Sequence, residues 1–148
     1  MMNDKILLLI LSLTGSPEEA ADIATLVDIE SSWVADAVSP VGAVGLLQIM
    51  PIAHVDVMDR IKPAVGKGDL LDPEYNLKIG LEYWRWIRST SQGKPERRAL
   101  ACWNWGYGNT RRWGGEFPAL PRETQDFIRK FRERRKKYAE AVNKVLTH

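Results

Sequence analysis

The chain has 148 residues, which suffices for one domain with a substantial core. Hydrophobic residues make up 45% and charged residues 27%, the mixture of a soluble globular protein, so the composition excludes disorder as the dominant state. One cysteine excludes an internal disulfide, and with two histidines it argues against a four-ligand zinc site or a catalytic triad. We therefore expect no metal and no cofactor, and chemistry carried by carboxylates.

Charge is distributed unevenly along the chain. Residues 1–59 hold nine acids and one base, residues 60–120 eleven bases and six acids, and residues 121–148 nine bases and four acids. Such a split suits an anionic partner approached through the C-terminal half, although a solvated basic helix face gives the same pattern. The pI of about 8.7 is below that of typical nucleic-acid modules, so no nucleic-acid partner is predicted.

Two helices are predicted at the N-terminus. The apolar run 6–13 is shorter than the ~20 residues that span a bilayer and lacks signal-peptide features, so residues 1–15 are predicted to hold an apolar helix. Next, Ser16 can cap a helix that starts at Pro17, with Glu19 completing a capping box. The apolar stripe of this second helix continues to Glu30, close to its predicted end.

The remaining chain reads as further helices separated by loops. Pro and Gly residues predict a loop over 35–51 and another over 106–121. Helical periodicity predicts helices over 76–88, 95–105 and 124–146. The last is basic outside, with an inward stripe of Phe127, Phe131, Tyr138, Val142 and Val145. No stretch has a convincing β period, so we predict a mainly α fold forming a single compact domain over 1–148.

Glu30 is the residue that the spacing singles out for chemistry. An acid on an apolar stripe near a helix C-terminus has a raised pKa, because both burial and the helix dipole disfavour the anion. A carboxyl that stays protonated near neutral pH can donate a proton to a leaving oxygen. The alternative is a buried structural glutamate satisfied by an arginine or a tyrosine.

Residues 30–51, ESSWVADAVSPVGAVGLLQIMP, resemble the catalytic segment of the soluble lytic transglycosylases, lysozyme-like enzymes that cleave peptidoglycan. The family pattern there is E-S-x-(F/W), then A-V-S, then G-A-x-G-L-M-Q-I-M-P. Three shorter blocks follow in the family's order: NLKIGLEYW at 76–84, ALACWNWGYGNTRRW at 99–113 and PRETQDFIRKF at 121–131.

This resemblance implies a lysozyme-like helical domain with a groove for a glycan strand. Glu30 takes the family's catalytic position. It would protonate the oxygen between N-acetylmuramic acid and N-acetylglucosamine, then act as base while the muramic 6-hydroxyl attacks the anomeric carbon. The product would be a 1,6-anhydromuramic end. One carboxylate suffices if the acetamido group of the substrate stabilises the cation, unlike the usual two-carboxylate scheme.

The resemblance also implies a set of substrate-binding residues: Ser39, Gln48, Trp103, Asn104, Trp105, Glu123 and Phe127. Three of them depart from the family, since Trp105 stands where a small residue is usual. Trp103 and Phe127 stand where tyrosines are usual, so two hydroxyls near the acid are missing. Trp103 and Trp105 can either cover the apolar faces of sugars or belong to the core.

Several alternatives stay open at this point. A lysozyme-type hydrolase on the same fold would need a second carboxylate, for which Glu116 and Asp36 are candidates. A wall-binding or secretion-associated module without turnover is a further alternative.

We expect a monomer that binds peptidoglycan strands, with the basic segment 129–138 as a candidate surface for the anionic cell envelope. The short length and the lack of a convincing signal peptide suggest a bacteriophage endolysin or virion-associated lysin. Such a protein would stay in the host cytoplasm until lysis, or in the virion, and act in the periplasm or cell wall.

Overall fold

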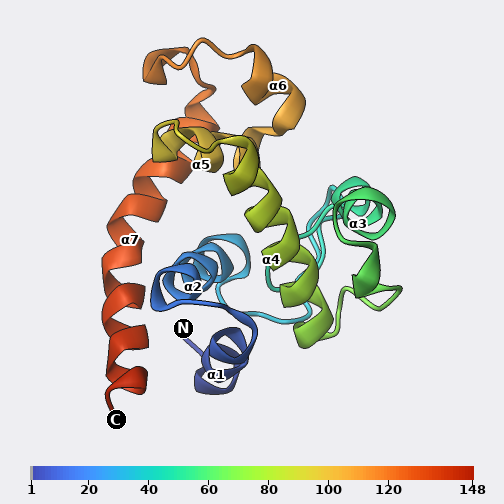
Figure 1. Cartoon of the computed structure of the whole chain (residues 1–148), viewed down its shortest axis with the longest axis vertical. Coiled ribbons are helices and arrows are strands. Elements are labelled where there is room, and N and C mark those ends of the chain that lie inside the picture. The colour runs from blue at the N-terminus through green and yellow to red at the C-terminus, as the bar shows by residue number, and fades with distance from the viewer. Residues whose placement is uncertain (1) are drawn as a thin grey trace.

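The computed structural model of the chain describes residues 2–148 and consists of helices joined by loops (Figure 1). The α-helices are α1 (Asp4–Leu13), α2 (Pro17–Ser31), α3 (Pro51–Asp56), α4 (Pro73–Thr90), α5 (Glu96–Trp105), α6 (Tyr107–Arg112) and α7 (Arg122–Leu146). A π-helical turn, η1 (Val57–Ile61), and two 3-10 turns, η2 (Pro63–Val65) and η3 (Phe117–Ala119), complete the helical elements of the described residues. The mainly α prediction is confirmed.

Helix α2 is the centre of the molecule. It lies between α7 and α4, with α1 near its first turn and α5 beyond its last (Figure 1). Its sequence suits this place, because small and aliphatic side chains surround the helix and allow close packing on several sides. The buried hydrophobic residues of α2 are Ala20, Ala21, Ile23, Ala24, Leu26 and Val27.

The predicted start of α2 is confirmed, with a small shift in its capping. The Ser16 hydroxyl accepts from the backbone N–H of Glu19 at 3.1 Å. Glu19 reaches back to the N–H of Gly15 at 2.8 Å, one residue before the predicted capping-box partner. The same carboxylate also binds the guanidinium of Arg85 on α4 at 2.7 Å, so it joins the helix start to a second helix.

A buried acid joins α2 to both of its long neighbours. Asp22 is 4% exposed and accepts from Arg135 of α7 at 2.7 Å and from Arg88 of α4 at 3.0 Å. Both guanidiniums reach solvent while the carboxylate does not, so the cost of burying the acid is offset by two charged hydrogen bonds.

Replacing Asp22 by asparagine is expected to lower the free energy of unfolding by about 1–3 kcal/mol, because a neutral amide cannot satisfy two guanidiniums as well as a carboxylate does. Chemical denaturation measures the change. Asp126→Asn is the control, since Asp126 binds two exposed arginines and its loss should cost less than about 0.5 kcal/mol. Equal losses in the two variants would contradict the role given to Asp22.

Two sequence predictions need correction. The segment 106–121, predicted as a loop, contains α6, because Gly106 (φ 97°) ends α5 and the buried Thr110 bonds back to the Gly106 carbonyl at 2.8 Å. Val145, predicted inward, is 39% exposed, since α7 extends beyond the core there. Separately, His54, one of the two histidines of the chain, contacts the Tyr75 hydroxyl at 2.8 Å.

The other elements agree with the periodicity or extend it. Residues 51–65 carry no predicted element, yet they form α3 and the two turns that follow it. Helix α4 is longer than the predicted 76–88, because Asp72 caps its N-terminus by accepting from Tyr75 N. The apolar run 6–13 forms most of α1, which buries Ile6, Leu7 and Ile10. Within residues 2–148, none of the helices has the length and apolar character needed to cross a bilayer.

Candidate active site

Glu30 lies in the last turn of α2, where two adjoining cavities meet. The first, about 250 Å³, is lined by Glu30, Leu47, Gln48, Ile49, Met50, Ile52, Ala53, Tyr83, Trp103, Asn104, Trp105 and Gly106. The second, about 470 Å³, is lined by Ile29, Glu30, Asn104, Glu123, Asp126, Phe127 and Lys130. Both share Glu30 and Asn104, so the carboxyl stands at the junction of an apolar and a polar half of one cleft.

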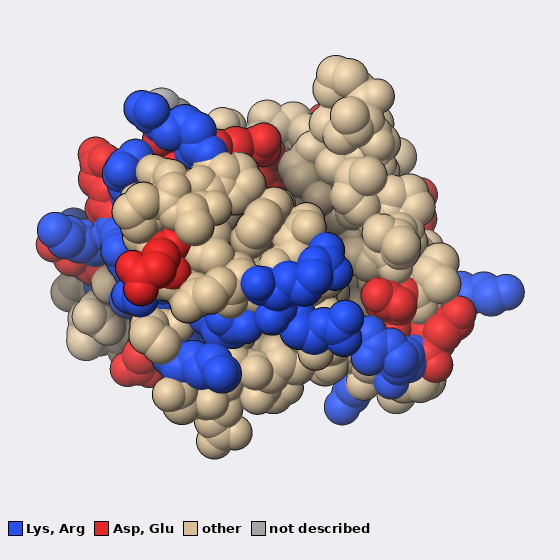
Figure 2. Space-filling view, turned by 90° about the horizontal axis from the view of Figure 1, so that it is seen from above, with Lys and Arg blue, Asp and Glu red and all other residues tan. Residues whose placement is uncertain are grey.

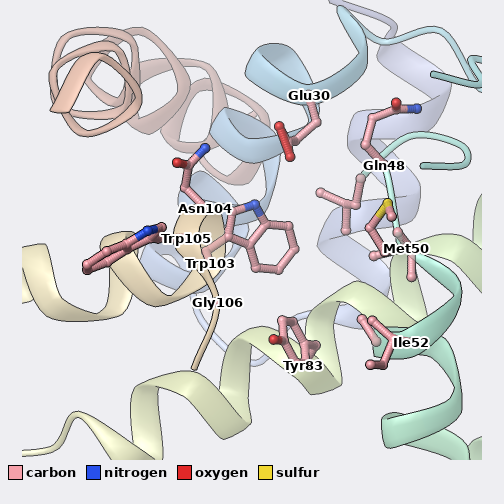
Figure 3. Close-up of a pocket in the computed structure, with 12 residues that line it drawn as sticks. Glu30, Gln48, Met50, Ile52, Tyr83, Trp103, Asn104, Trp105 and Gly106 are labelled. Carbon is pink, nitrogen blue, oxygen red and sulfur yellow. The ribbon is translucent and has the colours of Figure 1, made fainter. Parts of the chain in front are cut away.

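The environment of Glu30 favours the protonated acid. The pKa of Glu30 is raised to about 7, chiefly by burial; the indole N–H of Trp103 offsets part of the rise, and the nearby Glu123 carboxylate adds to it. Figure 3 shows the Glu30 carboxyl directed toward the nitrogen-bearing side of the Trp103 ring. Trp103 therefore presents a donor to the acid, although it lacks the hydroxyl of the tyrosine that the family pattern has there.

A sharp turn after Glu30 fixes the end of α2. Ser32 and Trp33 both have positive φ, at 51° and 67°, an uncommon conformation for residues other than glycine. The Trp33 side chain is buried, and its indole N–H donates to the Tyr138 hydroxyl of α7 at 3.0 Å. This long-range contact holds the turn, and with it the position of the acid at the helix end.

The loop facing Glu30 is tied together by one buried amide. Asn76 of α4 is fully buried; its side-chain oxygen accepts from Leu47 N at 2.9 Å, and its nitrogen donates to the carbonyls of Val44 and Leu70 at 2.8 and 2.9 Å. Gly45 (φ 79°) lies against this amide, and a side chain there would collide with it. The loop before α3 is therefore built around Asn76.

Gln48 has a more constrained place than the sequence indicates. Its φ is 50°, and its side-chain nitrogen donates to the carbonyls of Ala37 and Gly45 at 3.0 and 2.9 Å. Only the amide oxygen is left to accept from a ligand. Strain of this kind in a cleft is typical of functional sites, where the surrounding structure holds an unfavourable backbone angle.

Asn104 is oriented by helix α7. Its side-chain oxygen accepts from the hydroxyl of Thr124, a buried residue, at 2.8 Å. This bond leaves the side-chain nitrogen of Asn104 as a donor between the two cavities (Figure 3). Thr124 belongs to the block PRETQDFIRKF, but the helical pattern alone does not distinguish it from a surface threonine.

Most of the predicted site residues lie together around Glu30. The first cavity contains Gln48, Trp103 and Trp105, the second contains Glu123 and Phe127, and Asn104 borders both. Ser39 does not line either cavity, and its hydroxyl accepts from Ala43 N at 3.0 Å within the loop. A contact between Ser39 and substrate stays a prediction.

Tyr83 is a cleft residue that the periodicity does not single out. It lies on α4 beside the inward stripe, packs on Trp103 with ring centroids 5.9 Å apart, and faces the cavity (Figure 3). Burial raises its pKa to about 12, so its hydroxyl stays protonated and can donate. The signal for it in the sequence is the tyrosine of the block NLKIGLEYW.

The candidate water-activating acids of the sequence do not reach the cleft. Asp36 and Glu116 are both exposed and line neither cavity. The acids that accompany Glu30 are Glu123 and Asp126, from the first turns of α7. Of these, Glu123 acts on the pKa of Glu30 through its charge.

The basic segment 129–138 carries less free charge than its sequence suggests. Its four arginines all bind carboxylates: Arg129 binds Asp126, Arg132 binds Glu96, Arg134 binds Asp28 and Arg135 binds Asp22. Replacing Arg134 and Arg135 would therefore loosen the packing of α7 on α2, and any envelope contact of this segment depends on its lysines.

Similarity to known proteins agrees with this arrangement of helices and cleft. Residues 16–125 match the Transglycosylase SLT domain family. The chain is 41% identical over 88 residues to the soluble lytic murein transglycosylase of Salmonella typhimurium, which covers 58% of this chain and 14% of the relative. It is 36% identical over 93 residues to the membrane-bound lytic murein transglycosylase F of Vibrio cholerae, covering 59% of this chain and 16% of that relative.

Solved structures give the same result for the fold. The 70 kDa soluble lytic transglycosylase of Escherichia coli superposes with a TM-score of 0.76 and 26% identity, covering 91% of this chain and 24% of that one. The complex of the 70 kDa soluble lytic transglycosylase with bulgecin A gives 0.73 and 25%, covering 97% of this chain and 24% of that one. The fold and the site together define a class of protein: a helical domain with a buried acid where two cavities meet. This chain belongs to the Transglycosylase SLT domain family, and it spans about a seventh of the curated relatives it matches and a quarter of the solved ones.

Proposed function

We propose that this chain is a peptidoglycan lytic transglycosylase with Glu30 as its catalytic acid and base. The observation that carries the proposal is the carboxyl of Glu30, held with a pKa of about 7 where an apolar cavity meets a polar one. The names of the relatives, lytic murein transglycosylases, agree with this chemistry.

The geometry suits a strand lying along the cleft across Glu30. The Glu30 proton passes to the oxygen of the bond between N-acetylmuramic acid and N-acetylglucosamine, and the carbon–oxygen bond breaks. The muramic 6-hydroxyl then bonds to the anomeric carbon and returns its proton to Glu30. No water is consumed, and the glutamate ends protonated as it began, so one carboxyl near neutral pKa serves both steps.

The test is mass spectrometry of the fragments released from purified peptidoglycan. Products with 1,6-anhydromuramic ends, lighter by one water and lacking a reducible terminus, are expected. Reducing muramic ends would overturn transglycosylation in favour of hydrolysis. No release of fragments, with binding to the wall retained, would favour a wall-binding module.

Hydrolysis is the second candidate, and one observation favours it. Glu123 lines the polar cavity with Glu30, so a second carboxylate is present where a water could be activated. The variant Glu123→Gln separates the two reactions. A transglycosylase would keep its anhydro product in this variant, whereas a hydrolase would lose its reducing product by about 10²-fold or more.

Replacing Trp103 by phenylalanine is expected to move the alkaline limb of the pH–rate profile upward. The indole N–H lowers the pKa of Glu30, so its loss lets burial raise that pKa further and keeps the acid protonated to higher pH. Rates on purified peptidoglycan between pH 5 and 9 measure the shift. Trp105→Phe is the control, because Trp105 lines the same cavity without affecting the Glu30 pKa. A limb that stays in place or moves downward in Trp103→Phe would contradict the role of the indole.

We further propose that the activity serves lysis of a bacterial host by a phage and acts in the periplasm or cell wall, where the glycan is. Secretion-associated wall opening is the alternative. Expression in bacteria with and without a membrane-permeabilising phage protein tests this role. Lysis only when the permeabilising protein is present supports the phage role. No lysis in either condition contradicts the phage role.

A further inference from the structure

Four arginines at the end of the molecule remote from the chain termini have no acidic partner. Arg97 and Arg98 lie on α5, Arg111 and Arg112 on α6, and none has a carboxylate within 4.0 Å in the part of the chain described. Figure 2 looks onto this end and shows a band of Lys and Arg side chains across it, with Asp and Glu mainly toward the edges. We call these four residues the α5–α6 arginine surface.

Neutral groups hold these guanidiniums in place. Arg97 donates to the Gly115 carbonyl at 3.3 and 3.1 Å, and Arg98 donates to the Thr110 carbonyl at 3.0 Å. The guanidinium of Arg111 lies 5.9 Å from the centre of the Tyr107 ring, and Arg112 donates to the Asn109 side chain at 3.3 Å.

This arrangement fixes the arginines without neutralising them. A carbonyl or a ring orients a guanidinium, but the full positive charge and several N–H donors stay available to a ligand. The five arginines of α7 differ, because each is bound to a carboxylate.

A row of aromatic rings connects the cleft to this surface. Trp103, beside Glu30, packs on Tyr83 at 5.9 Å, and Tyr83 stacks on Trp86 at 6.0 Å. Trp86 packs on Tyr107 at 5.0 Å, and Arg111 lies over Tyr107, which is 41% exposed. The row therefore begins at the acid and ends beneath an unneutralised guanidinium.

We infer that the α5–α6 arginine surface binds the carboxylates of peptide stems on the peptidoglycan strand whose glycan occupies the cleft. This inference rests on the proposed function, which makes that strand the substrate. Stem peptides carry free carboxylates at intervals along the glycan, and guanidinium is the side chain best matched to a carboxylate. The surface is continuous with the cleft, and stem peptides are attached to the glycan strand that the cleft would hold. An anionic lipid or a nucleic acid has no such link to the cleft, so stem peptides are the favoured ligand.

The test measures binding without cleavage, in the full chain carrying Glu30→Gln. Removing two charges with Arg111→Gln and Arg112→Gln is expected to weaken pelleting with purified peptidoglycan at low salt by about tenfold and to reduce its salt dependence. Both side chains are exposed and outside the core, so the fold should be kept, as circular dichroism can verify. Replacing both by lysine should restore part of the binding, since charge returns without the planar fork.

The matched control removes two other exposed charges, with Lys67→Gln in the loop before α4 and Lys144→Gln near the end of α7, both outside the segment 129–138 and the cleft. This pair should change binding by less than about twofold, as expected of solvated surface charges. Peptidoglycan stripped of its stem peptides by an amidase is the second arm, on which the arginine variant and its parent should bind alike.

Several outcomes would overturn the inference. These are equal losses in the arginine and lysine pairs, a loss that persists on stripped glycan, or no binding of the parent at all. The inference would also be overturned if replacing Arg111 and Arg112 weakened binding to anionic vesicles or DNA more than binding to peptidoglycan. Fragment release by the protein with Glu30 intact is measured separately, so failure of the proposed function shows there, independently of the arginine result.

Discussion

Replacing Glu30 by glutamine is expected to lower peptidoglycan cleavage by about 10³-fold or more, because the variant removes the acid and the base of the reaction together. Glutamine keeps the size and hydrogen-bonding reach of the side chain, so binding of the strand should survive. Release of soluble fragments from purified peptidoglycan measures the loss.

The stability of Glu30→Gln provides its control. The folded pKa of Glu30, about 7, lies above its ordinary value of 4.5, so the folded protein binds the extra proton between these values and loses stability as pH rises through them. Glutamine removes this penalty. The variant should therefore be more stable than the parent at pH 8, by up to about 3 kcal/mol, and nearly unchanged at pH 4. Undiminished cleavage, or a lower stability at pH 8, would contradict the site.

Replacing Asn76 by alanine is expected to lower the free energy of unfolding by about 3 kcal/mol or more, because three buried backbone groups lose their hydrogen-bond partner. The groups are the N–H of Leu47 and the carbonyls of Val44 and Leu70. Cleavage should fall as well, since the loop that Asn76 holds carries Gln48 into the cleft. Urea denaturation and fragment release measure the two effects.

Asn143→Ala is the control for this substitution. Asn143 is exposed near the end of α7, and its loss should change stability by less than about 0.5 kcal/mol. If Asn76→Ala were as mild as this control, the loop would be held by other contacts and the role of the buried amide would be wrong.

Two departures from the family pattern have different consequences in the structure. At Trp103 the indole N–H lies toward Glu30 and lowers its pKa, so a donor is kept although the hydroxyl is gone. At Phe127 the ring is 4% exposed and borders the polar cavity, where it supplies no donor at all. The polar half of the cleft therefore depends on Asn104 and on the acids of α7.

Local signals in the sequence determined the helices and their acid. The Ser16 cap, Pro17 and the apolar stripe ending in Glu30 define α2, since capping and periodicity depend on residues within a few positions of one another. The raised pKa of Glu30 also follows from its place on that stripe. The resemblance in residues 30–51 then indicated the family, because a long run of residues is a more specific signal than any single spacing.

Only the tertiary structure decided which groups surround that acid and which charges remain free. Glu123, Trp103 and Tyr83 come to the cleft from three different helices, and no periodicity relates positions on separate helices. Likewise, three of the four arginines in the most basic segment bind acids of other helices, whereas four arginines of α5 and α6 have no acidic partner among the described residues. Charge and burial at a site depend on which side chains meet in space, and this pairing is settled by packing, not by order along the chain.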